Sequence, residues 1–269
     1  AAANGWRIFL WRSTKVPMMA HVESIRIYPV KGLDAMEREA VEITDAGTLR
    51  GDRAYAMVDA AGETLNGKQI DTIHEISTRF DPETNVLTLA TDGDKRRFDL
   101  TSERDEASEW FSDFVGEPID LRRREPPAFV DRPTLGPSVI STGTLEEVAS
   151  WFDEMTVEGA RRRLRPNVEV GGVSPFWEDR FLGDDPSGFE VGGSRLEGIK
   201  ACARCVVPSR DPDTGEPIER FRRRFVERRR ETLPEWVDED AFGHLYTVML
   251  ITSVPEADLG ETLRVGDGI

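Results

Sequence analysis

The segment Cys202-Ala203-Arg204-Cys205-Val206-Val207-Pro208 (CARCVVP) contains both cysteines of the chain. The two valines after the second thiol favour a short strand, which we place at residues 205–207. The next nine residues, 209–217 (SRDPDTGEP), carry Asp, Gly and Pro at turn-forming positions. We therefore expect a thiol-bearing strand edge that leads into an ordered polar loop.

Three interpretations of this Cys-x-x-Cys pair are open on residue chemistry alone. A structural zinc site needs four ligands, and the three histidines of the chain (His21, His74 and His244) show no ligand spacing. A thioredoxin-type redox pair belongs at the start of a helix, whereas the valines favour a strand. Two small buried thiols are the third interpretation.

The charges near the pair favour a metal ligand. Arg204 and Arg210 lie close to Cys205 in the sequence, and positive charge stabilises a thiolate. Thiolates are soft ligands that suit redox-active transition metals. Asp211 and Asp213 could transfer protons, although both are also typical turn residues. Cys205 is thus the candidate metal ligand, and the two aspartates are candidate catalytic groups.

The chain is strongly acidic, because 51 Asp+Glu against 35 Lys+Arg give a formal net charge of -16 over 269 residues. Only five of the basic residues are lysines, so 35 − 5 leaves 30 arginines. A salt-rich cytoplasm favours such a surface, and we predict a halophilic, cytoplasmic protein, with an acidic mesophilic protein as the alternative. A nucleic-acid-binding protein would need a basic face, which this balance opposes.

The sequence predicts no membrane span, since no stretch approaches the roughly 20 apolar residues that a bilayer requires. Two cysteines are too few for a secreted disulfide scaffold of this size. The apolar run 5–11 (GWRIFLW) is too short for a convincing secretory signal. We treat residues 1–19 as an N-terminal extension, because Met18-Met19 directly precede the first predicted strand.

The periodicity predicts a mainly β protein with some α, of the α+β class. Strands are expected at residues 21–30, 41–43, 53–59, 86–90, 139–140, 168–170, 189–191, 196–200, 245–251 and 262–265. Asp and Gly at 59–62 and 91–94 predict hairpin turns. The strands of the first third favour a small β-barrel or sandwich.

Helices are fewer and are expected at residues 103–115, 145–152 and 218–229. Thr144 and Glu147 have the spacing of a capping box for the second of them. Pro126-Pro127 and Pro133 mark an irregular connection and a candidate domain boundary.

The longer run 202–215 resembles the hallmark of MOSC domains, named for the C-terminal domain of molybdenum cofactor sulfurase. The segment 163–168 (RLRPNV) is similar to an Arg-x-Arg-Pro-Asn element of that family, and 175–179 (PFWED) to the acidic segment that follows. Residues 27–32 and 51–53 are similar to the accompanying N-terminal domain. The resemblance covers most of the chain after the N-terminal extension. It is closest to the branch of the mitochondrial amidoxime-reducing component and its bacterial relatives.

This resemblance implies an N-terminal β-barrel domain over residues 20–132 and a β-barrel-like MOSC domain over 133–269. It also implies a molybdenum cofactor, in which Cys205 completes the sulfur ligands of a pterin-dithiolene molybdenum, while Cys202 is structural or supports the ligand. The positions that would bind the cofactor are Lys31, Arg53, Ser141, Thr142, Arg165, Asn167 and Arg204. Gly32 stands where relatives often carry serine, so one phosphate contact is in doubt.

The implied activity is that of an oxidoreductase that reduces N-hydroxylated or N/S-oxygenated small molecules. The alternative is a non-catalytic carrier of the cofactor or of sulfur. Because the chain lacks the clustered cysteines of an iron–sulfur domain, electrons would come from separate proteins such as a ferredoxin or a flavin/iron–sulfur reductase.

Overall fold

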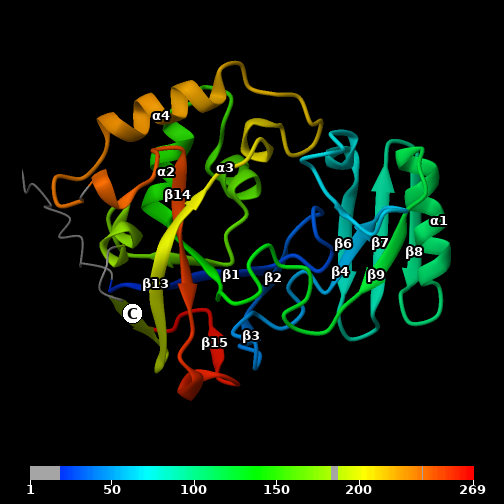
Figure 1. Cartoon of the computed structure of the whole chain (residues 1–269), viewed down its shortest axis with the longest axis horizontal. Helices are drawn as coiled ribbons and strands as arrows, with labels where there is room; N and C mark the ends of the chain where they lie inside the picture. The colour runs from blue at the N-terminus through cyan, green and yellow to red at the C-terminus, as the bar shows by residue number, and fades with distance from the viewer. Residues whose placement is uncertain (1–18, 183–186, 238) are drawn as a thin grey trace, which may run out of the picture.

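The computed structural model describes residues 19–182, 187–237 and 239–269. They form a large lobe, built mainly from residues 138–264, and a smaller lobe, built from residues 55–123 (Figure 1). The predicted N-terminal extension lies outside the described residues except for Met19. No helix in the described ranges is long and apolar enough to cross a bilayer.

The large lobe is built on a mostly antiparallel seven-stranded sheet, in which only β10 and β11 run parallel. Its strands, in pairing order, are β12 (Gly188–Val191), β13 (Ser194–Ala203), β14 (Thr247–Ser253), β10 (Ser138–Ser141), β11 (Val168–Gly171), β1 (His21–Ile27) and β2 (Met36–Arg38). The strand β1 pairs with β11 from His21↔Gly171 to Ile25↔Val168. The first strand of the chain is therefore an integral part of the large lobe.

Three helices cover one face of this sheet: α2 (Thr142–Ser150), α3 (Val157–Leu164) and α4 (Phe221–Glu231). Because strand side chains alternate, Ile140 packs under these helices while its neighbour Val139 packs into the core on the opposite face. Phe152 and Phe221 stack with their ring centroids 4.5 Å apart and join the helices to each other. The sheet thus has a hydrophobic core on each side, and both faces are fixed.

The smaller lobe holds two three-stranded sheets and one amphipathic helix. The sheets are β6-β7-β8 (Ser77–Asp81, Val86–Thr91, Asp94–Asp99) and β5-β4-β9 (Thr64–Leu65, Tyr55–Val58, Asp120–Arg123). The helix α1 (Arg104–Val115) buries Ala107 and Phe111 and ends at Gly116, whose φ of +83° closes the helix in the left-handed region. The predicted helix at 103–115 and both predicted hairpins are confirmed.

The C-terminal residues link distant parts of the large sheet. The strand β15 (Thr262–Arg264) pairs with β3 (Ala40–Glu42). Beyond it, the Gly266 N–H donates to the Val22 carbonyl (2.9 Å), and the Gly192 N–H donates to the Gly268 carbonyl (3.2 Å). The strand pairing within the described ranges leaves all four sheets open, so the mixed α+β class is what the structure confirms.

Several local predictions were wrong. Residues 205–207 do not form a strand: β13 ends at Ala203, and a 3₁₀ turn, η3 (Val207–Ser209), follows because Pro208 cannot donate to a sheet. The second helix begins at residue 142 and is capped by Ser141, not by Thr144. Glu147 accepts from the Trp151 indole (3.0 Å) and forms no capping box. The helix α3 was missed because it has eight residues and an internal glycine.

A buried acidic pair, Glu178 and Asp179, lies in the 3₁₀ turn η2 (Trp177–Phe181) beside the start of α2. Asp179 pairs with Arg229, a fully buried arginine of α4. Glu178 accepts from the Ser141 N–H at 3.3 Å, and its second oxygen has no partner among the described residues. Burial, assisted by the charge of Asp179, raises the pKa of Glu178 to about 7.

We expect the free energy of unfolding to fall as the pH rises from about 4.5 to about 7, because the unfolded chain releases the Glu178 proton first. The variant Glu178→Gln should lack this slope and should exceed wild type by about 2–3 kcal/mol at alkaline pH. Urea denaturation across this pH range measures it, with the exposed Glu190→Gln as control. Identical slopes for wild type and Glu178→Gln would contradict the assignment.

Candidate functional site

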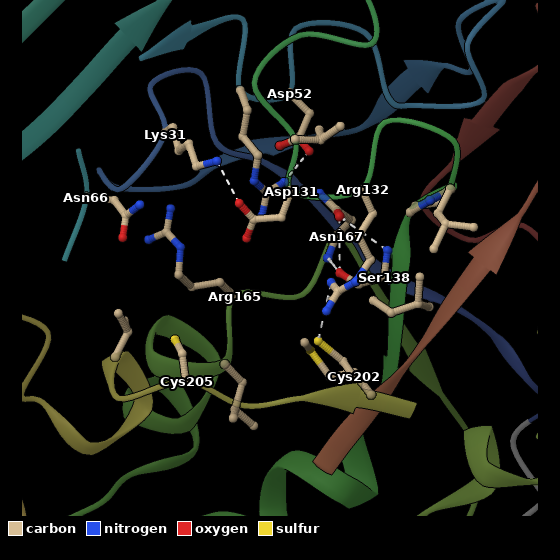
Figure 2. Close-up of a pocket in the computed structure, with 18 of the residues that line it drawn as sticks. Lys31, Asp52, Asn66, Asp131, Arg132, Ser138, Arg165, Asn167, Cys202 and Cys205 are labelled. Atoms are coloured by element: carbon tan, nitrogen blue, oxygen red, sulfur yellow. Dashed lines mark hydrogen bonds and ion pairs between the residues drawn. The ribbon is translucent and has the colours of Figure 1, made fainter. Parts of the chain in front are cut away.

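A cavity lined by both cysteines lies where β13 and β14 meet the loops of the N-terminal third and the segment between β9 and β10 (Figure 2). Its volume is about 220 Å³, far more than the roughly 30 Å³ that one water occupies in the liquid. Its polar lining includes Lys31, Asp52, Arg53, Asn66, Lys68, His74, Asp131, Arg132, Ser138, Arg165, Asn167, Cys202, Arg204 and Cys205. The cavity is therefore large enough for a ligand and is rich in cations.

The two cysteines lie on the same wall of this cavity but in different surroundings. Figure 2 shows Cys205 on the side of Asn66 and Arg165, and Cys202 on the side of Ser138. Both thiols are free, with Cys202 buried and Cys205 half-buried. The Cys202 sulfur accepts from Arg204 at 3.1 Å and more weakly from Arg132 at 4.0 Å. Of the two arginines predicted near Cys205, Arg204 thus contacts Cys202 instead, and Arg210 lies 3.6 Å from the Asp71 carboxylate.

Cys205 is positioned through its backbone. The Tyr246 hydroxyl donates to the Cys205 carbonyl at 2.9 Å. Burial raises the pKa of Tyr246 to about 12, so this hydroxyl remains a donor at neutral pH. No described residue forms a hydrogen bond with the Cys205 sulfur. The thiol is thus held in place at the cavity while its sulfur stays available to a ligand.

The cationic wall is organised around the buried ring of Tyr28. Arg53 and Arg165 both lie over this ring, with guanidinium carbons 4.9 and 4.0 Å from its centroid. Both arginines have left-handed backbone conformations, with φ of 54° and 59°. Arg165 adopts it as the C-cap of α3, and Pro166 prevents the helix from continuing. The Tyr28 hydroxyl donates to the Pro166 carbonyl at 3.0 Å.

The two arginines differ in charge compensation. Arg53 pairs with Asp52, which also accepts from the Tyr28 N–H at 2.8 Å. Arg165 donates to the Leu33 carbonyl at 2.7 Å but forms no ion pair with any residue in the described ranges. Burial lowers the pKa of Arg165, although a guanidinium stays charged at neutral pH. An incompletely compensated cation that faces a cavity is a physical reason for an anion to bind there.

Two of the five lysines of the chain also line the cavity. The Lys31 ammonium donates to the Phe129 carbonyl at 2.9 Å and to the Asp131 carboxylate at 2.6 Å. Lys68 lies 3.8 Å from the same carboxylate. Burial opposes ionisation of Asp131, but the hydrogen bond and charge of Lys31 outweigh it and lower the Asp131 pKa. The Asp131 carboxylate thus lies beside two lysine side chains, at a position that would also suit the anionic group of a ligand.

Asn167 lies in the cavity wall, and both the nitrogen and the oxygen of its side-chain amide form hydrogen bonds within the protein. The Asn167 amide nitrogen donates to the Arg26 carbonyl at 3.0 Å. Its oxygen accepts from the Ser138 N–H (3.2 Å) and hydroxyl (3.1 Å). Asn167 therefore joins the strands β1 and β10 at the edge of the cavity.

The structure places four predicted site residues away from the cavity lining. Ser141 caps α2, and the Thr142 hydroxyl donates to Glu169 at 2.9 Å. Asp211 organises the polar loop by accepting from the N–H groups of residues 213 and 214, and it pairs with Arg163 at 3.0 Å. Asp213 forms a bidentate ion pair with Arg162, and the hydrogen bonds from Arg162 lower the Asp213 pKa.

Sequence reasoning missed other residues of the cavity, among them Asn66, Asp131 and Arg132. His74 was considered only as a soft metal ligand. Its Nε2 is buried without a partner among the described residues, and burial with the charges of Arg165 and Arg210 lowers its pKa. These residues come from loops and carry no local pattern that marks them as functional. No group of three or more potential metal ligands occurs in the described part of the chain.

The fold and the cavity define a two-lobed α+β protein with a thiol-bearing, cationic ligand site. Two family models match the chain: the MOSC N-terminal beta barrel domain over residues 19–102 and the MOSC domain over residues 138–269. Together they cover most of the sequence, and the chain belongs to the MOSC family.

Relatives with assigned names are distant in sequence. Molybdenum cofactor sulfurase of rice (Oryza sativa subsp. japonica) is 24% identical over an alignment of 256 positions that covers 77% of this chain and 30% of that protein. Mitochondrial amidoxime reducing component 2 of Bos taurus is 24% identical over an alignment of 293 positions that covers 92% of this chain and 84% of the relative. The human mitochondrial amidoxime-reducing component 1 is 24% identical over an alignment that covers 81% of this chain and 76% of that protein. The chain thus spans less than a third of the sulfurase but most of the amidoxime-reducing components.

The Tyr28 ring should contribute more to stability than its hydroxyl. We expect Tyr28→Phe to lower the free energy of unfolding by about 1 kcal/mol, because one hydrogen bond is lost. Tyr28→Leu should lower it by about 3 kcal/mol, because both guanidinium groups lose the ring face and the core loses volume. Denaturant unfolding of the two variants measures the difference. Equal losses would mean that the ring face contributes little.

Proposed function

We propose that this protein is an oxidoreductase that binds a molybdenum cofactor through the thiolate of Cys205. The observation that carries the proposal is the cavity itself: Cys205 lies on one wall with an available sulfur, and the incompletely compensated Arg165 lines the same cavity. A soft metal ligand and an anion site within one cavity suit a group with both a metal and a phosphate. The family match and the names of the amidoxime-reducing relatives support this assignment.

The residues of the cavity fit such a cofactor by chemistry. Arg53, Arg165 and Lys31 would hold its phosphate, since a guanidinium can donate two parallel hydrogen bonds to phosphate oxygens. Arg204 donates to the Cys202 sulfur and, at 2.9 Å, to the Leu164 carbonyl at the end of α3. It would therefore keep in place the cavity wall that carries the two cysteines. When bound, the cofactor would supply a sulfur-ligated molybdenum that accepts and donates electrons.

We propose that the reaction is the reduction of an N-hydroxylated or N/S-oxygenated small molecule. For an N-hydroxyl compound, two electrons and two protons break the N–O bond and release water. The electrons would come from a separate protein, a ferredoxin or a flavin/iron–sulfur reductase. Asp211 and Asp213 remain candidate proton-transfer groups, although their ion pairs with Arg163 and Arg162 favour a role in ordering the loop. The acidic composition supports a cytoplasmic, salt-rich setting.

The assignment predicts unequal roles for the two thiols. Cys205→Ser should lose molybdenum and all reduction of benzamidoxime by dithionite, because the hydroxyl is a poor soft-metal ligand. Cys202→Ser should retain part of both, because the Cys202 sulfur is buried and already accepts from Arg204 and Arg132. Metal and pterin analysis of protein from a molybdenum-replete host, purified in high salt, gives a readout independent of turnover. Wild-type activity in Cys205→Ser would contradict the proposal.

The same protein preparation tests whether the protein is an enzyme or a non-catalytic carrier of the cofactor. Cofactor that stays bound through gel filtration and supports repeated turnover indicates an enzyme. Rapid transfer of cofactor to an apo-acceptor without turnover indicates a carrier. Zinc in place of molybdenum and pterin would contradict both.

A further inference from the structure

A second hollow lies on the other side of Cys205, along α4, and opens to solvent. Its apolar lining consists of Val206, Ile218, Phe221, Val226 and Tyr246. Val206 is 46% exposed, so apolar surface faces water at this place. Cys205 lines both this groove and the cationic cavity described above. A molecule in the groove would therefore have one end beside the thiol.

The polar lining of the groove is predominantly positive, although the chain as a whole is strongly negative. Five arginines and one glutamate contribute to it. Most of the arginines are engaged: Arg223 pairs with Glu227 at 2.8 Å, and Arg230 lies 3.9 Å from Glu239. Arg222 is exposed and lies 5.4 Å from the Tyr246 ring centroid, and it forms no ion pair with any residue that the structure describes. Arg222 is thus an exposed cation of the groove that has no carboxylate partner among the described residues.

We propose that this groove is the substrate site, and that it selects small molecules with an apolar body and an anionic group. The inference rests on the proposed reductase function and specifies its substrate class. The apolar body packs on Val206 and Ile218, the anionic group pairs with Arg222, and the reducible N-hydroxyl end lies at Cys205. An aromatic amidoxime that carries a carboxylate has this combination.

A matched pair of substrates tests the charge preference: benzamidoxime and its para-carboxylate, each reduced by the cofactor-loaded protein with dithionite. The variant Arg222→Gln should lower the ratio of kcat/KM for the carboxylate over the neutral compound about fivefold, mainly through KM, as for the loss of one solvent-exposed ion pair. The control is Arg228→Gln on the same helix, which pairs with Glu231 at 2.9 Å and does not line the groove. It should leave the ratio at the wild-type value.

Equilibrium binding of the carboxylate to cofactor-free protein, measured by calorimetry, separates this inference from the reductase proposal. Binding that weakens in Arg222→Gln but not in Arg228→Gln supports the groove even if no turnover occurs. Turnover with the same ratio in both variants overturns the groove and leaves the reductase proposal intact. If Arg222→Gln raises the KM for an electron-donor protein but not for either substrate, the groove binds that protein, and the inference is wrong.

Discussion

The structure depends on one arrangement of charge, in which the ring of Tyr28 lies between the guanidinium groups of Arg53 and Arg165. Two like charges at one ring repel each other, so the arrangement needs compensation. Asp52 compensates one cation, while the other relies on the ring face and the Leu33 carbonyl. The stack therefore holds two positive charges at the cavity, one paired with a carboxylate and one without an ion-pair partner among the described residues.

The same stack explains why the two parts of the chain form one site. Tyr28 and Arg53 come from the N-terminal third, whereas Arg165 ends a helix of the large lobe. Residue 28 directly follows β1, and residue 165 lies just before β11. Because these two strands pair antiparallel, the two residues lie next to each other. Either half alone would lack one side of the Tyr28 stack and most of the cavity.

Local patterns were sufficient for the α1 helix, the two hairpins and the identity of the thiol segment, since each depends on residues close in sequence. The two valines favoured a strand although Pro208 opposes one, so the turn at Val207–Ser209 was missed; no local pattern shows that Tyr246 holds the Cys205 carbonyl beyond the end of β13. Arg204 was expected to support Cys205, but its guanidinium turns back to Cys202. These outcomes depend on tertiary contacts between strands far apart in the sequence.

The contrast between the two cysteines follows from this packing. Cys202 belongs to β13, so its buried sulfur is surrounded by donors that hold it in place. Cys205 lies beyond the strand, where only its backbone is fixed, and its side chain borders a cationic cavity on one side and an arginine-lined groove on the other. A residue held by its backbone can present an unencumbered sulfur at the boundary between two binding spaces. In the proposed function, Cys205 would bind a metal from the cavity while a substrate approaches from the groove, and for this reason we propose Cys205 rather than Cys202 as the reactive thiol.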